Sequence, residues 1–532
     1  MASPRKLVLC VIDALAPSML ERAVAAGDAP TLAALMERGL YVPDCVAAFP
    51  SVTPVCAASI VTGVWQDRHE IPGMNWYHRS ERRYVEYGSS FRASQRAGLA
   101  RQLIDTVYNM NRSHLSRDTP TVFELLDDVD VRTAGTTYLM YRGRHRHEPQ
   151  RGTALTMIAS TLLRHPVMGP RELFYADVFA SRRTGCRSTL GMPGVRDQHS
   201  GCVGAHLVEN DLFDFLLLSL PDNDWHSHRH GPDGQLRSIA LADIQLARVM
   251  EAGGGVDRFL EEYAVVVMAD HSQADVVEKL SLQDALADFD VLSPGNRRAD
   301  GGPGAGGGEG GERARIAVCP SQRAAMVYTL DDDNAGLGPS EELLRLALEP
   351  EGVELAMWLI RDIHGAPAEA AIARAGGTGR AGGAGKAGRA AGAGGTRKSE
   401  TRAELRFRPG GDVLDPRGRS WSVEGDLAVL EAAVRDGRFV APDYPDALDR
   451  VWSALLCPNS GELLLSAAPG CEFADWGGQA HVGGGSHGSL RAEDSLGALI
   501  LCGVGDAPSA TGMPAQWAIR DVTGLVTDHF GV

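Results

Sequence analysis

The sequence predicts an α/β protein with a doubly wound, mostly parallel sheet flanked by helices, an inserted α+β subdomain and two flexible Gly/Ala-rich loops. Three observations predict this class. Apolar runs of strand length alternate with helical stretches, as in βαβ units. The runs are continuous, which is typical of strands buried on both faces of a parallel sheet. Aspartates follow three of the runs, and parallel sheets bind ligands at the carboxyl ends of their strands.

The expected elements follow one another along the chain. Lys6–Ile12 is the first strand, and the helical stretch Pro17–Arg38, broken near Gly27–Pro30, comes next. The later elements are the strands Phe213–Leu220, Tyr263–Met268 and Leu496–Gly503 and the helix Ser238–Glu251. Each of these strands is too apolar to lie on a solvated face, so we expect them side by side in one core.

Composition divides the 532 residues into a core and an insertion. Segments 295–314 and 366–400 are rich in Gly, Ala and charge and bury too little apolar surface to order themselves, so we expect a flexible loop and a flexible linker. The expected organisation is core 1–294 with a cap over about 73–205, loop 295–314, subdomain 315–365, linker 366–400, subdomain 401–470 and core 471–532.

Charge and cysteine content limit the function and the compartment. The net charge of −16 argues against binding a nucleic-acid polymer, but bound cations would reverse the local sign for a small phosphorylated substrate. Nine scattered cysteines without a CxxC motif favour buried thiols in a reducing compartment over a disulfide framework. No apolar run approaches the roughly 20 residues that span a bilayer, so we expect a cytoplasmic protein without a membrane segment. The oligomeric state stays open.

Metal-ligand side chains occur in short clusters at strand ends and in a Gly-rich loop. Carboxylates and imidazoles of this kind, with one hydroxyl, are typical of a two-metal hydrolytic site. The candidates are Asp13, Thr53, Asp222, His226, Asp270, His271 and His487. Asp13 and Thr53 could instead cap helices, His228 and His230 add imidazoles to the third cluster, and His481 competes with His487.

These clusters, with the segment FPSVTPVCAASIVTG over 49–63, resemble the alkaline phosphatase superfamily, and most closely its nucleotide pyrophosphatase/phosphodiesterase (type I phosphodiesterase) branch. The resemblance implies an alkaline phosphatase-like core and two Zn²⁺ ions. It implies that one ion is held by Asp13, Thr53, Asp270 and His271 and the other by Asp222, His226 and His487. The mixed set of ligands also suits zinc on chemical grounds, with Mn²⁺ or Mg²⁺ as alternatives.

The resemblance further implies hydrolysis of a phosphodiester or nucleotide pyrophosphate through a covalent intermediate on Thr53, although Ser51 is close by. Alternatives within the superfamily are a phosphomonoesterase, a sulfatase or phosphonate hydrolase, and a phosphosugar mutase. The alternative of another class is a non-catalytic binding or scaffold protein on a retained metalloenzyme fold. Cys56, where the family often has Asn, and Ser272, where it often has Gly, motivate that alternative.

Substrate contacts are expected from the cap and from the helix after Thr53. Cys56 takes the place of an asparagine that helps to bind a substrate oxygen in the family, and Trp76 and Tyr77 could stack on a flat group. Arg142 and Arg144, together with Arg182 and Arg183, could bind phosphate oxygens in bidentate fashion. The alternative for each of the cap residues is an ordinary polar surface of the cap.

Overall fold

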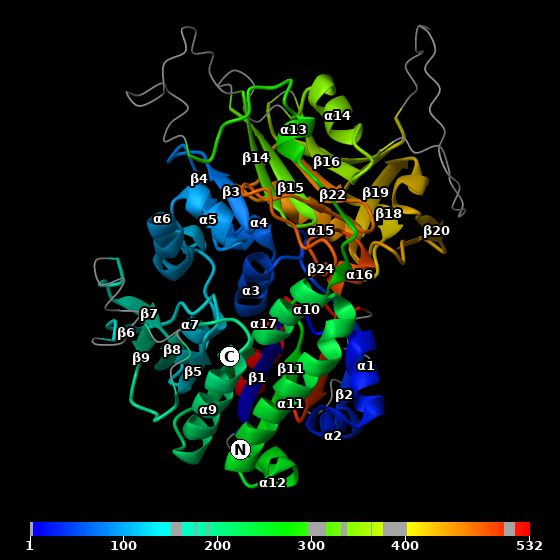
Figure 1. Ribbon diagram of the computed structural model, residues 1–532. Coiled ribbons are helices and arrows are strands. Elements are labelled where there is room, and N and C mark those ends of the chain that lie inside the picture. Colours follow the sequence, from blue (N-terminus) through cyan, green and yellow to red (C-terminus); the bar gives the residue numbers. More distant parts are fainter. Residues whose placement is uncertain are drawn as a thin grey trace, which may run out of the picture.

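The computed structural model describes residues 4–150, 162–175, 178–187, 189, 191–295, 315–330, 338–362, 364–375, 402–504 and 516–532. An eight-stranded sheet forms the lower part of the molecule in Figure 1. Its strand order is β2-β25-β11-β1-β10-β5-β8-β9. The strands are β1 (Lys6–Ile12), β2 (Leu40–Val46), β5 (Thr133–Thr136), β8 (Glu172–Tyr175), β9 (Phe179–Ala180), β10 (Phe215–Leu220), β11 (Tyr263–Met268) and β25 (Leu496–Cys502).

The centre of this sheet is parallel, as predicted. Strand β1 pairs in parallel with both β10 and β11, and β5 continues the parallel order beyond β10. Strand β25 runs antiparallel to β11 and β2 runs antiparallel to β25. The predicted mostly parallel α/β core is therefore confirmed. The carboxyl ends of β1, β10 and β11 lie together at one edge, because parallel neighbours end on the same side.

Helices cover both faces of the sheet. Successive residues of β1 pack into different clusters, with Leu9 on one face and Cys10 on the other. One face is covered by α1 (Pro17–Ala26), α2 (Pro30–Arg38), α9 (Arg196–Glu209) and α11 (Gln235–Ala252), and the other by α3 (Thr53–Thr62), α7 (Val122–Asp127) and α17 (Asp521–Phe530). Each large apolar side chain buried between the layers contributes about 1.5–3 kcal/mol.

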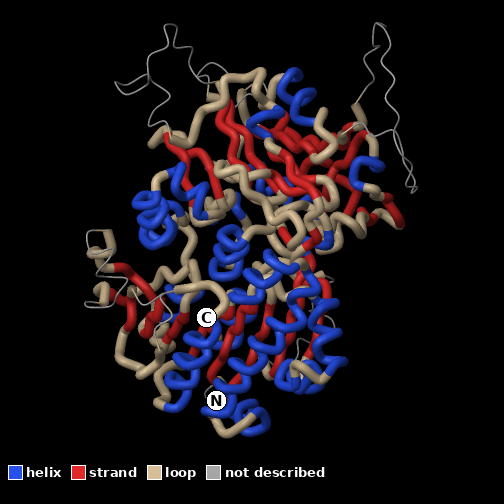
Figure 2. Tube along the Cα trace, in the orientation of Figure 1, coloured by secondary structure: helices blue, strands red, loops and turns tan. Residues whose placement is uncertain are grey.

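A second, nine-stranded sheet lies above the first in Figures 1 and 2. It is built from β14 (Ile316–Ser321), β15 (Ala324–Thr329), β16 (Val353–Arg361), β17 (Pro367–Arg374), β18 (Glu404–Leu414), β19 (Ser420–Gly425), β20 (Ala433–Arg435), β21 (Arg438–Val440) and β22 (Leu463–Ala467). Helix α14 (Glu341–Leu348) packs Leu343 and Leu344 against it. The expected linker over 366–400 begins too early, because its first residues pair with β16 and β18 as β17. Apart from Gly295, Ala366 and Ala375, the remaining loop and linker residues lie outside the described part.

Shorter elements connect the two sheets and form the cap. The cap contains the hairpin β3 (Asn75–His78) and β4 (Arg83–Glu86), the pair β6 (His145–His147) and β7 (Val167–Gly169), and the π-helix η1 (Asp105–His114). The remaining elements are α4 (Gln66–His69), α5 (Phe91–Ala97), α6 (Leu99–Ile104), α10 (Asp222–His230), η2 (Pro232–Gly234), α12 (Val256–Glu262), β12 (Ala274–Asp275), β13 (Glu278–Leu280), α13 (Leu282–Ala285), η3 (Leu427–Leu430), α15 (Ala447–Leu456), β23 (Cys471–Phe473), β24 (Gly485–Ser486) and α16 (Ala492–Ser495).

The cysteines differ in part from the expectation. Seven are buried free thiols, but Cys186 and Cys202 form a disulfide between the segment before α9 and α9 itself. Their Cα atoms are 5.9 Å apart, which is within the range that a disulfide bridges, and spacing along the sequence does not reveal such proximity. Within the described residues, every helix is too short or too polar to cross a bilayer.

Candidate metal centre

Strand ends bring the first carboxylates together. Asp13 follows β1, and Asp270 follows β11 by two residues. The backbone N–H of Ala14 donates to the Asp270 carboxylate over 3.1 Å, so the two strand ends are joined directly. The N–H of Asp13 donates to the Leu220 carbonyl at the end of β10 over 3.1 Å. The edge of the sheet thus sets the position of both acids.

One group of possible ligands consists of Asp13, Asp224 and His271, whose ligand atoms lie within 4.8 Å of one another. The His271 Nε2 atom is 3.6 Å from the nearer Asp13 oxygen and 3.5 Å from Asp270. The Thr53 hydroxyl, at the first residue of α3, is 3.2 Å from the same nitrogen. A hydroxyl, an imidazole and three carboxylates therefore face one small volume.

A second group consists of Asp224, His228 and His487. Asp224 and His228 are one turn apart on α10, so both side chains project from one face of the helix. The Asp224 carboxylate is 3.4 Å from His228 Nε2 and 3.5 Å from His487 Nε2. Asp224 belongs to both groups, and its carboxylate lies where it could serve two neighbouring cations.

The three histidines share one orientation. Each places Nδ1 against a backbone carbonyl: His271 at Ser272 over 3.0 Å, His228 at Gly485 over 2.8 Å and His487 at Ser51 over 2.7 Å. A histidine whose Nδ1–H donates in this way carries its lone pair on Nε2. Fixing the tautomer through the outer nitrogen is the usual arrangement for a histidine that ligates a metal through the inner one.

Close packing holds the Gly-rich loop before His487 against α10. A Cβ on Gly484 would lie 2.1 Å from the His228 carbonyl oxygen, so only glycine allows this approach. On the other side of His487, the Asp494 carboxylate accepts the Ser489 N–H over 2.8 Å, and its carbonyl accepts the Ser272 N–H over 2.9 Å. The loops that carry His271 and His487 are therefore tied to one another.

The electrostatics of the site suit bound cations. Burial raises the pKa of the Asp13 carboxyl well above its usual range, and Asp270 and Asp224 raise it further. Burial opposes ionisation of Asp224 as well, yet His228, His487 and His271 hold its pKa well below the usual range. One Asp13 oxygen and His487 Nε2 are buried without a hydrogen-bond partner. Carboxylate oxygens and imidazole lone pairs left in this state fit a divalent cation such as zinc.

Comparison with known proteins identifies the family. A family model described as type I phosphodiesterase / nucleotide pyrophosphatase matches residues 7–361. This chain belongs to that family. Membership supports a phosphoryl-transfer hydrolase that acts on phosphorus-containing esters. A search of curated proteins found no match.

Solved structures agree with this chain in fold. Phosphonoacetate hydrolase from Sinorhizobium meliloti 1021, in complex with phosphonoformate, matches with a TM-score of 0.54 at 15% identity, covering 99% of this chain and 96% of that one. The same hydrolase with phosphonoacetate gives a TM-score of 0.54 at 14% identity and the same coverage. The predicted alkaline phosphatase-like fold is thereby confirmed.

In this type I phosphodiesterase family member, the structure separates Asp222 and His226 from the other candidates. The Asp222 carboxylate accepts hydrogen bonds from the Gly194 N–H and the Arg196 guanidinium, each over 2.8 Å, and from the Asp197 N–H over 3.0 Å. The His226 ring packs against that of Trp225, with ring centroids 5.0 Å apart. Asp222 and His226 are expected from the sequence to share an ion with His487, but neither residue belongs to the two groups of possible ligands in the described part of the chain.

The pair that joins the site, Asp224 and His228, has the same Asp-x-x-x-His spacing as Asp222 and His226. A shift of two residues turns a helical side chain by roughly 200°, so the two pairs lie on opposite faces of α10. Spacing cannot separate them, because both pairs follow the same strand. The histidine-rich segment does supply side chains to the candidate groups, but which of them face the site depends on the packing of α10 against the sheet.

His481 and Ser51, the sequence-based alternatives to His487 and Thr53, make other contacts. The His481 Nδ1 atom is 2.9 Å from the Glu472 carboxylate, and its ring stacks on His228 with centroids 4.0 Å apart. Ser51 is fully buried, and its hydroxyl donates to the Ser489 carbonyl over 3.2 Å and accepts the Gly488 N–H over 3.1 Å. The half-buried Thr53 hydroxyl, by contrast, faces the ligand cluster.

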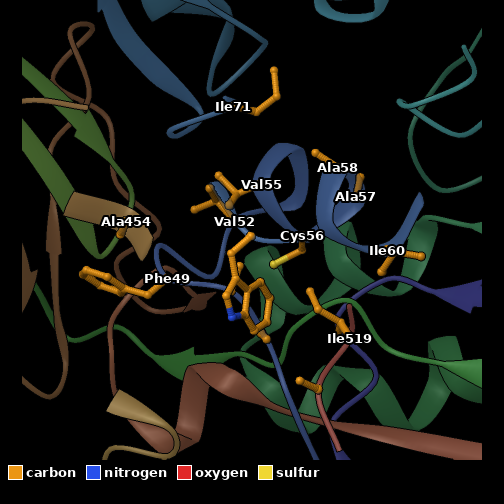
Figure 3. Packing of buried hydrophobic residues seen from close by; sticks show 14 of the residues in the cluster. Phe49, Val52, Val55, Cys56, Ala57, Ala58, Ile60, Ile71, Ala454 and Ile519 are labelled. Carbon is orange, nitrogen blue, oxygen red and sulfur yellow. The ribbon is translucent and has the colours of Figure 1, made fainter. Parts of the chain in front are cut away.

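Cys56 lies among apolar side chains, although it follows Thr53 by three residues. Figure 3 shows its side chain among Phe49, Val52 and other apolar groups. It is fully buried, and burial raises the pKa of its thiol well above the usual range, with Asp270 raising it further. The expected role of Cys56 in contacting substrate therefore has no support in the contacts that it makes.

The other expected substrate residues are also engaged elsewhere. Trp76 is buried, and its indole N–H donates to the Tyr87 hydroxyl over 3.2 Å. Tyr77 packs against Tyr84 and Tyr328 in the same region. The ion pairs of the arginines are Arg142 with Glu124, Arg144 with Asp128 and Glu124, and Arg182 with Glu172. Sequence composition places aromatic and basic residues in the cap, but their contacts stabilise the cap rather than the metal centre.

Proposed function

We propose that this chain is a metal-dependent hydrolase that cleaves a phosphodiester or nucleotide pyrophosphate bond through a covalent intermediate on Thr53. One observation carries the proposal: three histidines, oriented by backbone carbonyls, present Nε2 atoms beside aspartates and one accessible hydroxyl. The proposed ligands are Asp13, Thr53, Asp270 and His271 for one zinc ion and Asp224, His228 and His487 for the other. Asp224 and His228 replace the Asp222 and His226 of the sequence-based hypothesis.

When bound, two such cations would stabilise negative charge on the attacking and leaving oxygens of a phosphoryl transfer. The residues of this chain supply the rest. Thr53 opens α3, and no side chain caps that helix, so its N-terminal end is free to attract the phosphate anion. The fixed tautomers of His271 and His487 keep N–H donors pointed away from the reacting groups.

In the first step the Thr53 oxygen would form a bond to phosphorus while the bond to the leaving oxygen breaks. The Thr53 proton passes to solvent, and the leaving oxygen takes the electron pair and is protonated from solvent. In the second step a water oxygen attacks phosphorus, the bond to Thr53 breaks, and the threonine hydroxyl forms again. The net reaction consumes one water for each ester bond.

A nucleophile test separates this proposal from a binding-only protein. Thr53→Ala should abolish turnover of bis-p-nitrophenyl phosphate, by about 10³-fold or more, because no other accessible hydroxyl faces the described ligand cluster. Zinc content, measured by elemental analysis, should remain above one equivalent per chain.

Thr53→Ser is the matched control, since it keeps a hydroxyl at the same backbone position and should retain measurable turnover. Turnover unchanged in Thr53→Ala would refute the assignment of the nucleophile. A wild-type protein that contains zinc but hydrolyses none of a panel of phosphate monoesters, diesters, nucleotides, sulfate esters and phosphonoacetate would refute the enzymatic function.

A further inference from the structure

A second cavity lies in the cap, away from the metal centre. It encloses about 600 Å³ between η1, the segment around Tyr141–Arg146 and the segment around His165–Met168. None of its lining residues belongs to either ligand group of the metal centre. Its volume is within the range of small-molecule sites, which are roughly 300–1,000 Å³.

The wall of this cavity is held in place by polar contacts. The Asn111 side chain accepts the N–H groups of Tyr141 and Arg142 over 2.8 and 3.0 Å and donates to the Leu139 carbonyl over 2.8 Å. Asn111 lies on η1, a π-helix of 10 residues. Helices of this type are rare and occur frequently at functional sites, because their wide turns displace side chains from regular positions.

Positive charge is concentrated at the cavity. Five arginines line it: Arg112, Arg117, Arg142, Arg144 and Arg146. The last three form ion pairs with carboxylates of the cap. Arg112 and Arg117 are exposed and have no carboxylate partner among the residues that the structure describes, in a chain with a net charge of −16.

These two arginines are also close to one another. The Arg117 guanidinium donates to the Arg112 backbone carbonyl over 3.5 Å, which brings it next to the residue that carries the other cation. Both guanidinium groups line one cavity without a described carboxylate partner, and a bound anion would balance their charge. Guanidinium also matches the geometry of phosphate oxygens.

Part of the cavity lining is apolar. Tyr108 and Tyr141 are buried, and Val167 packs into the same satellite cluster. The Tyr108 hydroxyl accepts the His165 N–H over 3.3 Å, so this ring is fixed in position. An aromatic wall beside a pair of cations favours a ligand with a flat apolar body and a negatively charged group.

From this arrangement we propose that the cap cavity is a second binding site, separate from the metal centre, for an aromatic phosphate of nucleotide size. Its phosphate pairs with Arg112 and Arg117, and its ring packs against the tyrosine wall. The site does not depend on metal ligation, so the proposal stands or falls independently of the proposed catalytic function.

Calorimetric titration with adenosine 5′-monophosphate tests the site in the zinc-loaded, full-length protein. Adenosine, which has the same ring without the phosphate, should bind at least about tenfold more weakly, because charge-assisted hydrogen bonds to phosphate are lost. The double variant Arg112→Ser/Arg117→Ser should also lose about tenfold in affinity, and added salt should weaken binding.

Two comparisons locate the ligand. Asp224→Asn, which damages the metal centre, should keep the affinity for adenosine 5′-monophosphate within about twofold of wild type. The double variant Arg258→Ser/Arg345→Ser removes the same number of exposed arginines from α12 and α14 and should bind normally. The Arg112/Arg117 variant should hydrolyse bis-p-nitrophenyl phosphate at the wild-type rate, which also shows that it folds.

The proposal is wrong if wild type fails to bind the nucleotide at about 1 mM, or if the Arg112/Arg117 variant binds as tightly as wild type. Loss of binding in Asp224→Asn would place the nucleotide at the metal centre and would equally overturn a separate site.

Discussion

Helix α10 carries a buried aspartate on one face and a half-buried aspartate on the other, and the two faces are built differently. On one face, the protein satisfies the Asp222 carboxylate with two backbone N–H groups and the Arg196 guanidinium. On the other face, the Asp224 carboxylate accepts a hydrogen bond from the Gln273 side-chain amide over 2.5 Å, and lies beside Asp13 and histidines whose Nδ1 atoms face backbone carbonyls. One Asp13 oxygen has no hydrogen-bond partner. The first arrangement is complete without a ligand, whereas the second leaves charge and lone pairs that a cation would satisfy.

The contrast shows how a structural carboxylate differs from a candidate ligand. Burial alone does not distinguish Asp222 from the acids of the metal centre, because all of them are largely buried. The hydrogen-bond donors around each carboxylate do distinguish Asp222 from those acids. A carboxylate surrounded by N–H groups, such as Asp222, stabilises the fold at that position. A buried carboxylate oxygen that lacks a donor and lies beside other carboxylates, such as that of Asp13, requires a cation or a proton.

The largest expected effect comes from replacing the aspartate on each face of α10 in turn. Asp224→Asn should lower turnover by about 10³-fold, since it removes a charge shared by both proposed cation sites. Elemental analysis should show a matching loss of zinc. Asp222→Asn should keep its zinc and at least about a tenth of its activity, while losing about 1–3 kcal/mol of stability through one mismatched hydrogen bond.

The opposite pattern, with zinc lost in Asp222→Asn and kept in Asp224→Asn, would reverse the assignment of the two faces. Thermal unfolding of both variants provides the control for folding.

An intermediate effect is expected at Asp446, a buried carboxylate far from α10 in sequence. Both of its oxygens lack a hydrogen-bond partner, and burial, with Asp415 adding to it, raises its pKa to about 7. The unfolded chain has the ordinary pKa of about 3.9. Between about pH 4 and pH 7, the folded state therefore holds a proton that the unfolded state has already released. This contribution to the stability of the folded state is lost as the pH rises through 7.

Asp446→Asn keeps the group neutral at every pH. The variant should be more stable than wild type at pH 8, by on the order of 1–3 kcal/mol, with a smaller difference at pH 5. Urea unfolding at both pH values measures this, and the exposed Asp288→Asn serves as the matched control. Equal pH profiles for wild type and Asp446→Asn would show that a buried carboxylate without donors need not bind a proton.

The smallest effect is expected at Ser51. Its carbonyl orients His487, but among the described residues its hydroxyl forms hydrogen bonds only with Ser489 and Gly488. Ser51→Ala should therefore lose about 1 kcal/mol of stability and keep turnover within a few-fold of wild type. A loss of turnover as large as that expected for Thr53→Ala would identify Ser51 as a competing nucleophile.

Much of the fold follows from local pattern. Continuous apolar runs locate β1, β10, β11 and β25 within two residues of their ends, since a strand buried on both faces is built mainly from apolar residues. The parallel order of β1, β10 and β11 then places the acids after them at one edge. The prediction of the linker fails at β17, because alanine-rich sequence pairs as a strand once neighbours on both sides supply the hydrogen bonds.

The sequence by itself determined that Asp13, Asp270 and His271 lie at the edge of the sheet, that a hydroxyl and a Gly-rich loop join them, and that the third cluster contributes an aspartate and a histidine. Only the tertiary structure places Asp224 and His228 beside the other candidates, His487 rather than His481 in the same group, and Trp76 and Arg142 in contacts within the cap. The physical reason is that side-chain spacing is local. The phase of a helix and the donors around a carboxylate, by contrast, are fixed by segments that are distant in the sequence.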